Sequence, residues 1–108
     1  CISYLTIEHQ GPTPPEFSRA VGAHVYGCDV CQEVCPYNAV SPRSASPTWL
    51  PRPVWDQPRL EDLTRLSDSE LRDAIKGSAM QRARKAGLRR NFAVASANAP
   101  PAPDPVRR

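Results

Sequence analysis

The clearest periodic pattern of hydrophobic residues lies in the last third of the chain. Leu88, Phe92 and Ala95 follow one another at intervals of four and three residues, which places them on one face of a helix. Gly87 directly precedes this face and either weakens the helix or interrupts it. We therefore predict a helical segment over residues 59–98 whose apolar face packs on the rest of the chain.

Cap signals define a second helix ahead of that face. Ser67 and Glu70 have the spacing of a capping box, in which each side chain accepts a hydrogen bond from the other residue's backbone N–H. The helix is predicted to run to about Lys76. Gly77 then supplies the residue without a Cβ that helix ends favour.

The first forty residues carry weaker structural signals. Residues 1–9 alternate apolar and polar positions loosely, and this pattern fits a short strand or a helical turn equally well. Thr13, followed by Pro15 and Glu16, predicts a helix start with Thr13 as the cap. Gly22 is the predicted end of that short helix.

Proline divides the chain into segments. The 13 prolines and an aromatic share of 6% argue against a large packed core, and the prolines of residues 41–58 exclude a regular helix or a central strand there. We expect this stretch to be an extended connector that Trp49 and Trp55 hold against the surface beneath, with base stacking by an indole as the alternative. The predicted division of the chain is 1–40, 41–58, 59–98 and an unstructured Pro/Ala tail over 99–108.

The net charge of +3 is unevenly distributed. Residues 74–103 contain no acidic residue, so the positive charges there are not balanced locally. Such a run is either a solvated helix face or a surface that meets the phosphates of a nucleic acid. No aromatic residue lies between the charges, so we expect contact to backbone phosphate and no reading of bases. The candidate phosphate-binding residues are Arg82, Arg84, Lys85, Arg89 and Arg90.

Four cysteines supply the strongest chemical signal. Cys28 and Cys31 are separated by two residues, a spacing that can turn two thiolates toward one metal centre, and Cys35 is followed by proline. In two-cluster iron–sulfur proteins, the cysteine before proline ligates the second cluster. Two disulfides are the alternative in a secreted chain, but a Cys-x-x-Cys pair suits a structural disulfide poorly. Because the cysteines suit a metal centre better than disulfides, we expect a reducing, cytoplasmic location. The sequence has no membrane span of about 20 apolar residues, and we expect no membrane partner.

This pattern predicts that the thiolates are divided between two iron–sulfur clusters. Cys1, Cys28 and Cys31 are predicted to ligate one cluster and Cys35 the other, in a partial ferredoxin-like module within a mainly α fold with irregular loops. Two clusters need further ligands, which we expect from a cysteine motif preceding Cys1. A zinc site made by all four cysteines is the rival metal centre, although zinc ribbons normally pair two Cys-x-x-Cys motifs.

Two stretches of sequence resemble one protein family. Residues 1–12 (CISYLTIEHQGP) and 26–38 (YGCDVCQEVCPYN) are similar to the epoxyqueuosine reductases, and residues 76–91 resemble their C-terminal helical segment. That family reduces the epoxide on a modified base of tRNA and uses cobalamin with two [4Fe-4S] clusters. The resemblance implies that the chain is a C-terminal part of such an oxidoreductase and has no catalytic residue of its own.

The resemblance also implies roles for particular residues. Ser3, Cys28 and Asp29 correspond to positions that approach cobalamin, and residues 8–10 lie where a substrate-facing loop is expected. The expected partners are tRNA carrying epoxyqueuosine and an external electron donor, and the protein is expected to be a monomer. Two other functions stay open. One is an electron-transfer protein with two clusters related to the cobalamin-dependent reductive dehalogenases, and the other is a zinc-stabilised nucleic-acid-binding module.

Overall fold

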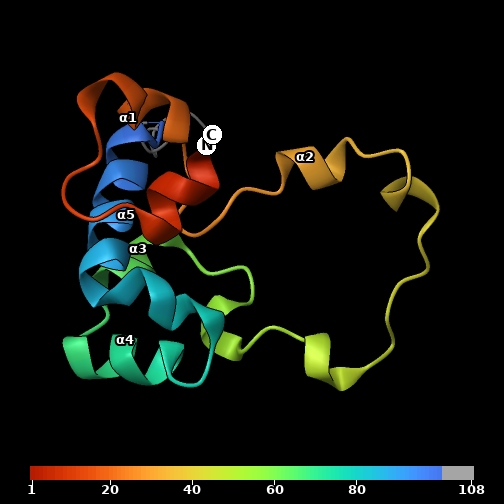
Figure 1. The fold of residues 1–108 in the computed structure, drawn as a ribbon. Coiled ribbons are helices and arrows are strands. Elements are labelled where there is room, and N and C mark those ends of the chain that lie inside the picture. Colours follow the sequence, from red (N-terminus) through yellow and green to blue (C-terminus); the bar gives the residue numbers. More distant parts are fainter. Residues whose placement is uncertain (101–108) are drawn as a thin grey trace, which may run out of the picture.

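The computed structural model describes residues 1–100, a part of the chain in which helices are joined by loops and no strand occurs (Figure 1). The prediction of a mainly α fold is confirmed. The predicted tail lies, from residue 101 onward, outside the described residues. The α-helices are α1 (Pro15–Val21), α2 (Val30–Glu33), α3 (Leu60–Arg65), α4 (Asp68–Ile75) and α5 (Arg84–Asn98). Shorter turns are η1 (Tyr4–Glu8, π-helical) and the 3₁₀ helices η2 (Asn38–Val40), η3 (Pro47–Trp49), η4 (Pro53–Trp55) and η5 (Ala79–Ala83).

Helix α5 is the centre of the helical body, because α1, α3, α4, η1 and η5 all pack against it. Leu88, Phe92 and Ala95 are buried together on its inner face, as their spacing predicts. Gly87 lies within α5 and does not interrupt it, since burial of the neighbouring apolar face offsets the roughly 1 kcal/mol that a mid-helix glycine costs. The core cluster comprises Leu63, Leu71, Ile75, Ala83, Leu88 and Phe92.

The start of α4 confirms the predicted capping box. The backbone N–H of Glu70 donates to Ser67 Oγ over 3.2 Å, and the backbone N–H of Ser67 donates to Glu70 Oε2 over 2.7 Å. The hydrogen bond from the Ser67 backbone N–H, followed by an interaction with the Ser67 side chain, stabilises the ionised carboxylate, so the pKa of Glu70 lies below its usual value. Gly77, which follows the helix, has a φ of +70°, the conformation for which glycine is favoured.

The start of α1 differs from the sequence prediction, because Pro14 and not Thr13 is the cap residue, and no side chain caps the helix. A residue that precedes proline is disfavoured in the α region, so Pro14 stays extended (ψ 132°) before Pro15, and the helix begins at Pro15. The predicted end is confirmed. Gly22 has a φ of +60°, and its N–H donates to the carbonyl of Arg19.

Residues 2–8 are helical, which decides between the strand and the helical turn that the sequence left open. η1 buries Leu5 and Thr6 against the helical body. Thr6 satisfies its buried hydroxyl inside the turn, donating to the carbonyl of Ile2 over 2.8 Å. A buried β-branched residue is therefore compatible with this helical segment.

The proline-rich stretch is partly as expected. It contains no regular α-helix or strand, but η3 and η4 each form a single turn that begins with a proline. Trp55 packs against the core, and its indole N–H donates to the carbonyl of Ala74 over 3.1 Å, as predicted for a connector held to the surface. The same prediction is wrong for Trp49, which is 76% exposed.

Residues 28–50 form an arm that leaves the helical body and carries α2 away from it (Figure 1). Its apolar side chains are exposed because no other described segment covers them. They are Val30, Val34, Tyr37, Val40, Trp49 and Leu50. The division at residues 40 and 58 stays a prediction. None of the helices within residues 1–100 combines the length and hydropathy that crossing a membrane requires.

Candidate metal centre

The four cysteines lie at the surface of the described structure, and their thiols are free. Cys1 and Cys31 are exposed, whereas Cys28 and Cys35 are half-buried. Within residues 1–100, no three or more His, Cys, Asp or Glu side chains lie together so that they could hold a metal ion. The structure therefore places the predicted ligands on two segments without assembling them, and their division between clusters stays a prediction.

Local backbone hydrogen bonds shape the cysteine segment of the arm. The carbonyl of Asp29 accepts from the backbone N–H groups of Gln32 (2.9 Å) and Glu33 (2.8 Å), which starts α2, while the Asp29 side chain is not used as a cap. Cys31 lies inside this single-turn helix. Cys35 follows it, and its N–H donates to the carbonyl of Gln32 over 3.3 Å.

Two side chains of the first segment hold the start of the arm. Ser3 Oγ accepts from the backbone N–H of Cys28 over 3.0 Å, and Thr6 Oγ1 accepts from the backbone N–H of Gly27 over 2.9 Å. Gly27 adopts a φ of +73°, which turns the chain at the point where the arm leaves the body. Of the residues expected near cobalamin, Ser3 and Cys28 are thus in contact, and Asp29 is exposed beside them.

Asn91 is a site residue that the sequence analysis missed. Its amide nitrogen, buried on the inner face of α5, donates to the carbonyls of Thr6 (2.7 Å) and Val25 (2.8 Å). It thereby joins the segment that follows Cys1 to the segment that precedes Cys28. The signal was present in the sequence as a polar residue between Leu88 and Phe92 on a predicted apolar face.

Arg90 makes a second connection from α5 to the first segment, and all five of its N–H donors are engaged. Its guanidinium donates to the carbonyls of Leu5 (2.8 Å), His9 (2.7 Å) and Gly11 (2.9 Å), and twice to Asn91 Oδ1 (3.0 and 3.1 Å). Burial lowers the pKa of Arg90 from its usual value, yet arginine remains protonated at neutral pH.

The other candidate phosphate-binding residues differ in how far they are engaged within the chain. Arg89 donates to the backbone carbonyls of Thr64 and Leu66 and, over 3.2 Å, to Asp68. Lys85 also faces Asp68, at 3.6 Å. The hydrogen bond from Arg89, followed by the charge of Lys85, holds the pKa of Asp68 below its usual value.

Arg82 and Arg84 are the more exposed of the basic residues. Arg82 forms an ion pair of 2.5 Å with Glu8, although 69% of its side chain remains accessible. Arg84 is exposed at the start of α5. The structure therefore turns Arg89 and Arg90 toward the chain and leaves Arg82 and Arg84 at the surface.

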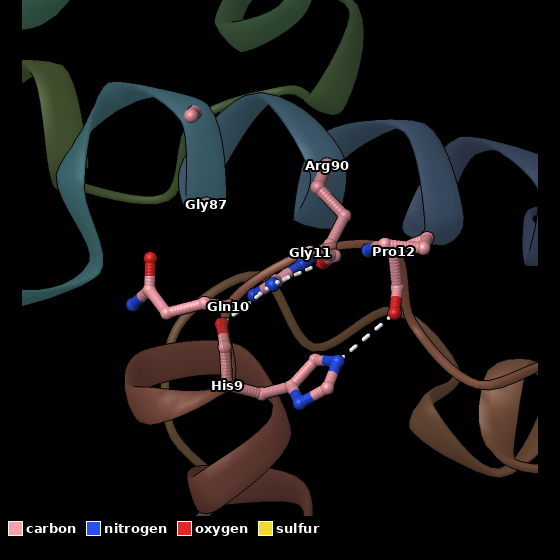
Figure 2. A pocket seen from close by; sticks show the side chains of 7 residues that line it. His9, Gln10, Gly11, Pro12, Gly87 and Arg90 are labelled. Carbon is pink, nitrogen blue, oxygen red and sulfur yellow. Dashed lines mark hydrogen bonds between the residues drawn. The ribbon is translucent and has the colours of Figure 1, made fainter.

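A small pocket lies between the loop that follows η1 and one face of α5 (Figure 2). His9 Nε2 donates to the carbonyl of Pro12 over 2.9 Å, and this bond, together with those from Arg90, fixes the loop. The cavity measures about 190 Å³, smaller than pockets that enclose drug-sized molecules. It is lined by His9, Gln10, Gly11, Pro12, Ala86, Gly87 and Arg90.

Comparison with known proteins identifies similar sequences and structures. Residues 1–38 match the family described as "4Fe-4S double cluster binding domain". The epoxyqueuosine reductases of Shewanella oneidensis and Escherichia coli are 44% and 40% identical over 96% and 93% of this chain, and each match covers 26% of the relative. A crystal structure of epoxyqueuosine reductase with an epoxyqueuosine-modified tRNA-Tyr stem loop is similar at 34% identity and a TM-score of 0.79, over 91% of this chain and 26% of that one. The chain spans about a quarter of the length of the curated relatives that it matches.

Proposed function

We propose that this chain, which is related over nearly its whole length to the epoxyqueuosine reductases, is the part of such an oxidoreductase that supplies cluster ligands and contacts tRNA. The observation that carries the proposal is the position of all four cysteines inside the 1–38 match to a two-cluster domain. The complete enzyme would reduce epoxyqueuosine in tRNA to queuosine. Cytoplasmic location, a monomeric state and an external electron donor stay predictions.

The donor set fits an iron–sulfur site. All four cysteines are free, and thiolates are the ligands that iron–sulfur clusters require. Cys1, Cys28 and Cys31 would hold one cluster and Cys35 the other, in a ferredoxin-like arrangement whose remaining ligands come from another part of the enzyme. When bound, such clusters supply single electrons. The chain's contribution is to hold the cysteine backbones in place, as the contact of Ser3 with Cys28 does.

Cobalamin would contact this chain only at the start of the arm. Ser3, Cys28 and Asp29 are neighbours at the start of the arm, and two of them are only half-buried. Three neighbouring residues cannot enclose a corrin, so most contacts to it would come from other parts of the enzyme. When bound, cobalamin carries the difficult redox chemistry, and protein groups bind and orient it.

The basic residues would hold tRNA by its phosphates. Arg82, Arg84 and Lys85 support this proposal best, because their cationic groups are less committed to backbone carbonyls than those of Arg89 and Arg90. A structural neighbour with a bound tRNA stem loop adds support. Because the contacts are electrostatic, binding would weaken steeply as the salt concentration rises.

Anaerobic reconstitution of the complete enzyme tests the proposal. The wild-type protein should take up about eight irons and absorb broadly in the visible. A Cys35→Ser variant should lose the signal of one cluster, and a Cys31→Ser variant should lose that of the other. A colourless protein that holds zinc, or about four irons or fewer with all thiols intact, would contradict the proposal.

A further inference from the structure

Thr6 and Asn91 are the two buried polar residues of the described part of the chain, with 1% and 2% of their surfaces exposed. Both link the segment that begins at Cys1 with the segment that leads to Cys28. The carbonyl of Thr6 and that of Val25 accept from the amide of Asn91, while the hydroxyl of Thr6 accepts from Gly27. The two buried polar residues of residues 1–100 thus connect the same two segments, residues 1–6 and residues 25–28. We call this contact the junction.

The junction continues to the backbone of both cysteines. On one side, the N–H of Leu5 donates to the carbonyl of Cys1 over 3.1 Å, and the hydroxyl of Thr6 donates to the carbonyl of Ile2. On the other side, the N–H of Cys28 donates to Ser3 Oγ over 3.0 Å. These hydrogen bonds, together with the backbone between neighbouring residues, therefore connect α5 to two cysteines that are 27 positions apart in sequence.

The amide of Asn91 is held in one orientation. Its nitrogen donates twice, to Thr6 and Val25, and its oxygen accepts twice from Arg90. The buried amide is thus fully satisfied, and turning it over would place donors against donors. An apolar residue such as leucine at this position would leave the carbonyls of Thr6 and Val25 without the donor that Asn91 supplies. The asparagine therefore serves the connection between these two segments in addition to filling the core.

We propose that Asn91 and Thr6 are positioning residues that set the relative placement of Cys1 and Cys28 as ligands of one cluster. The proposal rests on the proposed function, because it requires these two cysteines to share a cluster. In this proposal α5, which carries no cysteine, controls the geometry of the cluster site formed by Cys1 and Cys28. Groups that orient metal ligands in this way commonly change metal affinity by about tenfold or more when they are removed.

The chain provides a matched control for Asn91. Asn98 lies about two turns further along α5, and its amide nitrogen also donates to two backbone carbonyls, those of Ser18 (2.7 Å) and Gly22 (3.0 Å). These carbonyls belong to α1 and its end, so Asn98 joins α1 to α5 without touching a cysteine segment. Replacing either asparagine removes two hydrogen bonds to backbone carbonyls, but only Asn91 also accepts from Arg90 and connects to the candidate ligands.

The experiment compares Asn91→Ala with Asn98→Ala in the complete, anaerobically reconstituted enzyme. We expect Asn91→Ala to change the low-temperature electron paramagnetic resonance signal and the midpoint potential of one reduced cluster. We also expect this variant to lose iron from that cluster to a chelator about ten times faster than wild type. Asn98→Ala should lower the melting temperature by less, because its half-buried amide loses two hydrogen bonds instead of four, and it should leave the signal, the potential and the iron loss unchanged.

A second pair of variants serves if Asn91→Ala does not fold. Thr6→Val keeps the shape of the side chain and removes its hydroxyl, whereas Thr6→Ser keeps the hydroxyl. Thr6→Val should reproduce the altered signal, and Thr6→Ser should restore the wild-type one. Thr64→Val is the control, because that exposed hydroxyl donates only to the carbonyl of Glu61 within α3.

Two results would overturn the proposal, and they differ from failure of the proposed function. Equal effects of Asn91→Ala and Asn98→Ala on the signal would mean that Asn91 only supports the fold. A wild-type signal in Thr6→Val would mean that the junction does not reach the cluster. If wild-type enzyme does not take up about eight irons, the proposed function itself is wrong, and the comparison of variants is not reached.

Discussion

Arg90 fixes the loop that follows the first segment, and replacing it with lysine should release that loop. Three backbone carbonyls, those of Leu5, His9 and Gly11, accept from Arg90 at 2.7–2.9 Å. Lysine keeps the positive charge but has a single nitrogen, which cannot reach three separated carbonyls at once. The substitution therefore removes hydrogen bonds while the net charge stays the same.

The magnitude follows from the number and exposure of these bonds. A hydrogen bond from a charged donor contributes about 1.5–3 kcal/mol when buried, and the half-buried position of Arg90 reduces this to about 1 kcal/mol for each carbonyl. Lysine can keep one of the three, and the loss of the other two would lower the free energy of local opening by about 2 kcal/mol. At about 1.4 kcal/mol per tenfold change, amide exchange in this segment should be about 30 times faster.

Hydrogen–deuterium exchange of the complete enzyme, read on peptides covering residues 4–12, measures this effect. The backbone N–H of His9, which donates to the carbonyl of Tyr4 over 3.0 Å, is one of the protected amides to follow. Arg82→Lys is the control, because that exposed side chain forms a surface ion pair and should change exchange little. Equal exchange in Arg90→Lys and Arg82→Lys would refute the view that Arg90 holds the loop.

Three further predictions follow from the described contacts. Ser67→Ala removes the cap of α4 and should cost about 0.5–2 kcal/mol, visible as faster amide exchange in that helix. The pKa of Asp68 is lowered in the folded chain, so its contribution to stability is present above the usual value of 3.8 and is lost as the pH falls through the lowered pKa. The difference in melting temperature between wild type and Asp68→Asn should therefore shrink below about pH 4. Replacing Arg82 and Arg84 with alanine should lower the slope of tRNA affinity against salt by about one unit for each lost phosphate contact, and an unchanged slope would exclude them as contacts.

Features set by neighbouring residues were predictable from the sequence. The capping box at Ser67 and Glu70 and the helix end at Gly22 each depend on contacts within a few residues, and the structure confirms both. The same local reasoning failed at Thr13, because the effect of Pro15 on the conformation of Pro14 outweighed the preference of threonine for a cap. Local signals therefore compete, and which of them determines the helix start is known only from the backbone conformation.

Contacts between distant segments could not be predicted in this way. The hydrogen bond from Asn91 to Thr6 spans 85 positions, and that from Arg90 to His9 spans 81. The residue type predicts no such distant partner in either case, since asparagine and arginine are mostly surface residues. Cysteine spacing indicated the kind of chemistry. The side chains that position the cysteines became visible only when the helices were packed together.

The basic run shows that charged residues which are alike in a sequence do not all present their charge at the surface. Arginine at the surface and arginine that binds the chain's own carbonyls are identical in a sequence, and α5 contains both kinds. Arg90 has all five donors engaged and Arg89 binds two backbone carbonyls, so neither is free to meet a phosphate without breaking those bonds. Arg82 and Arg84 remain exposed near the first turn of α5, where the positive end of the helix dipole also favours an anion. Phosphates of tRNA are therefore expected at the start of α5, whereas Arg90 holds the segment that follows Cys1 and Arg89 holds the loop between α3 and α4.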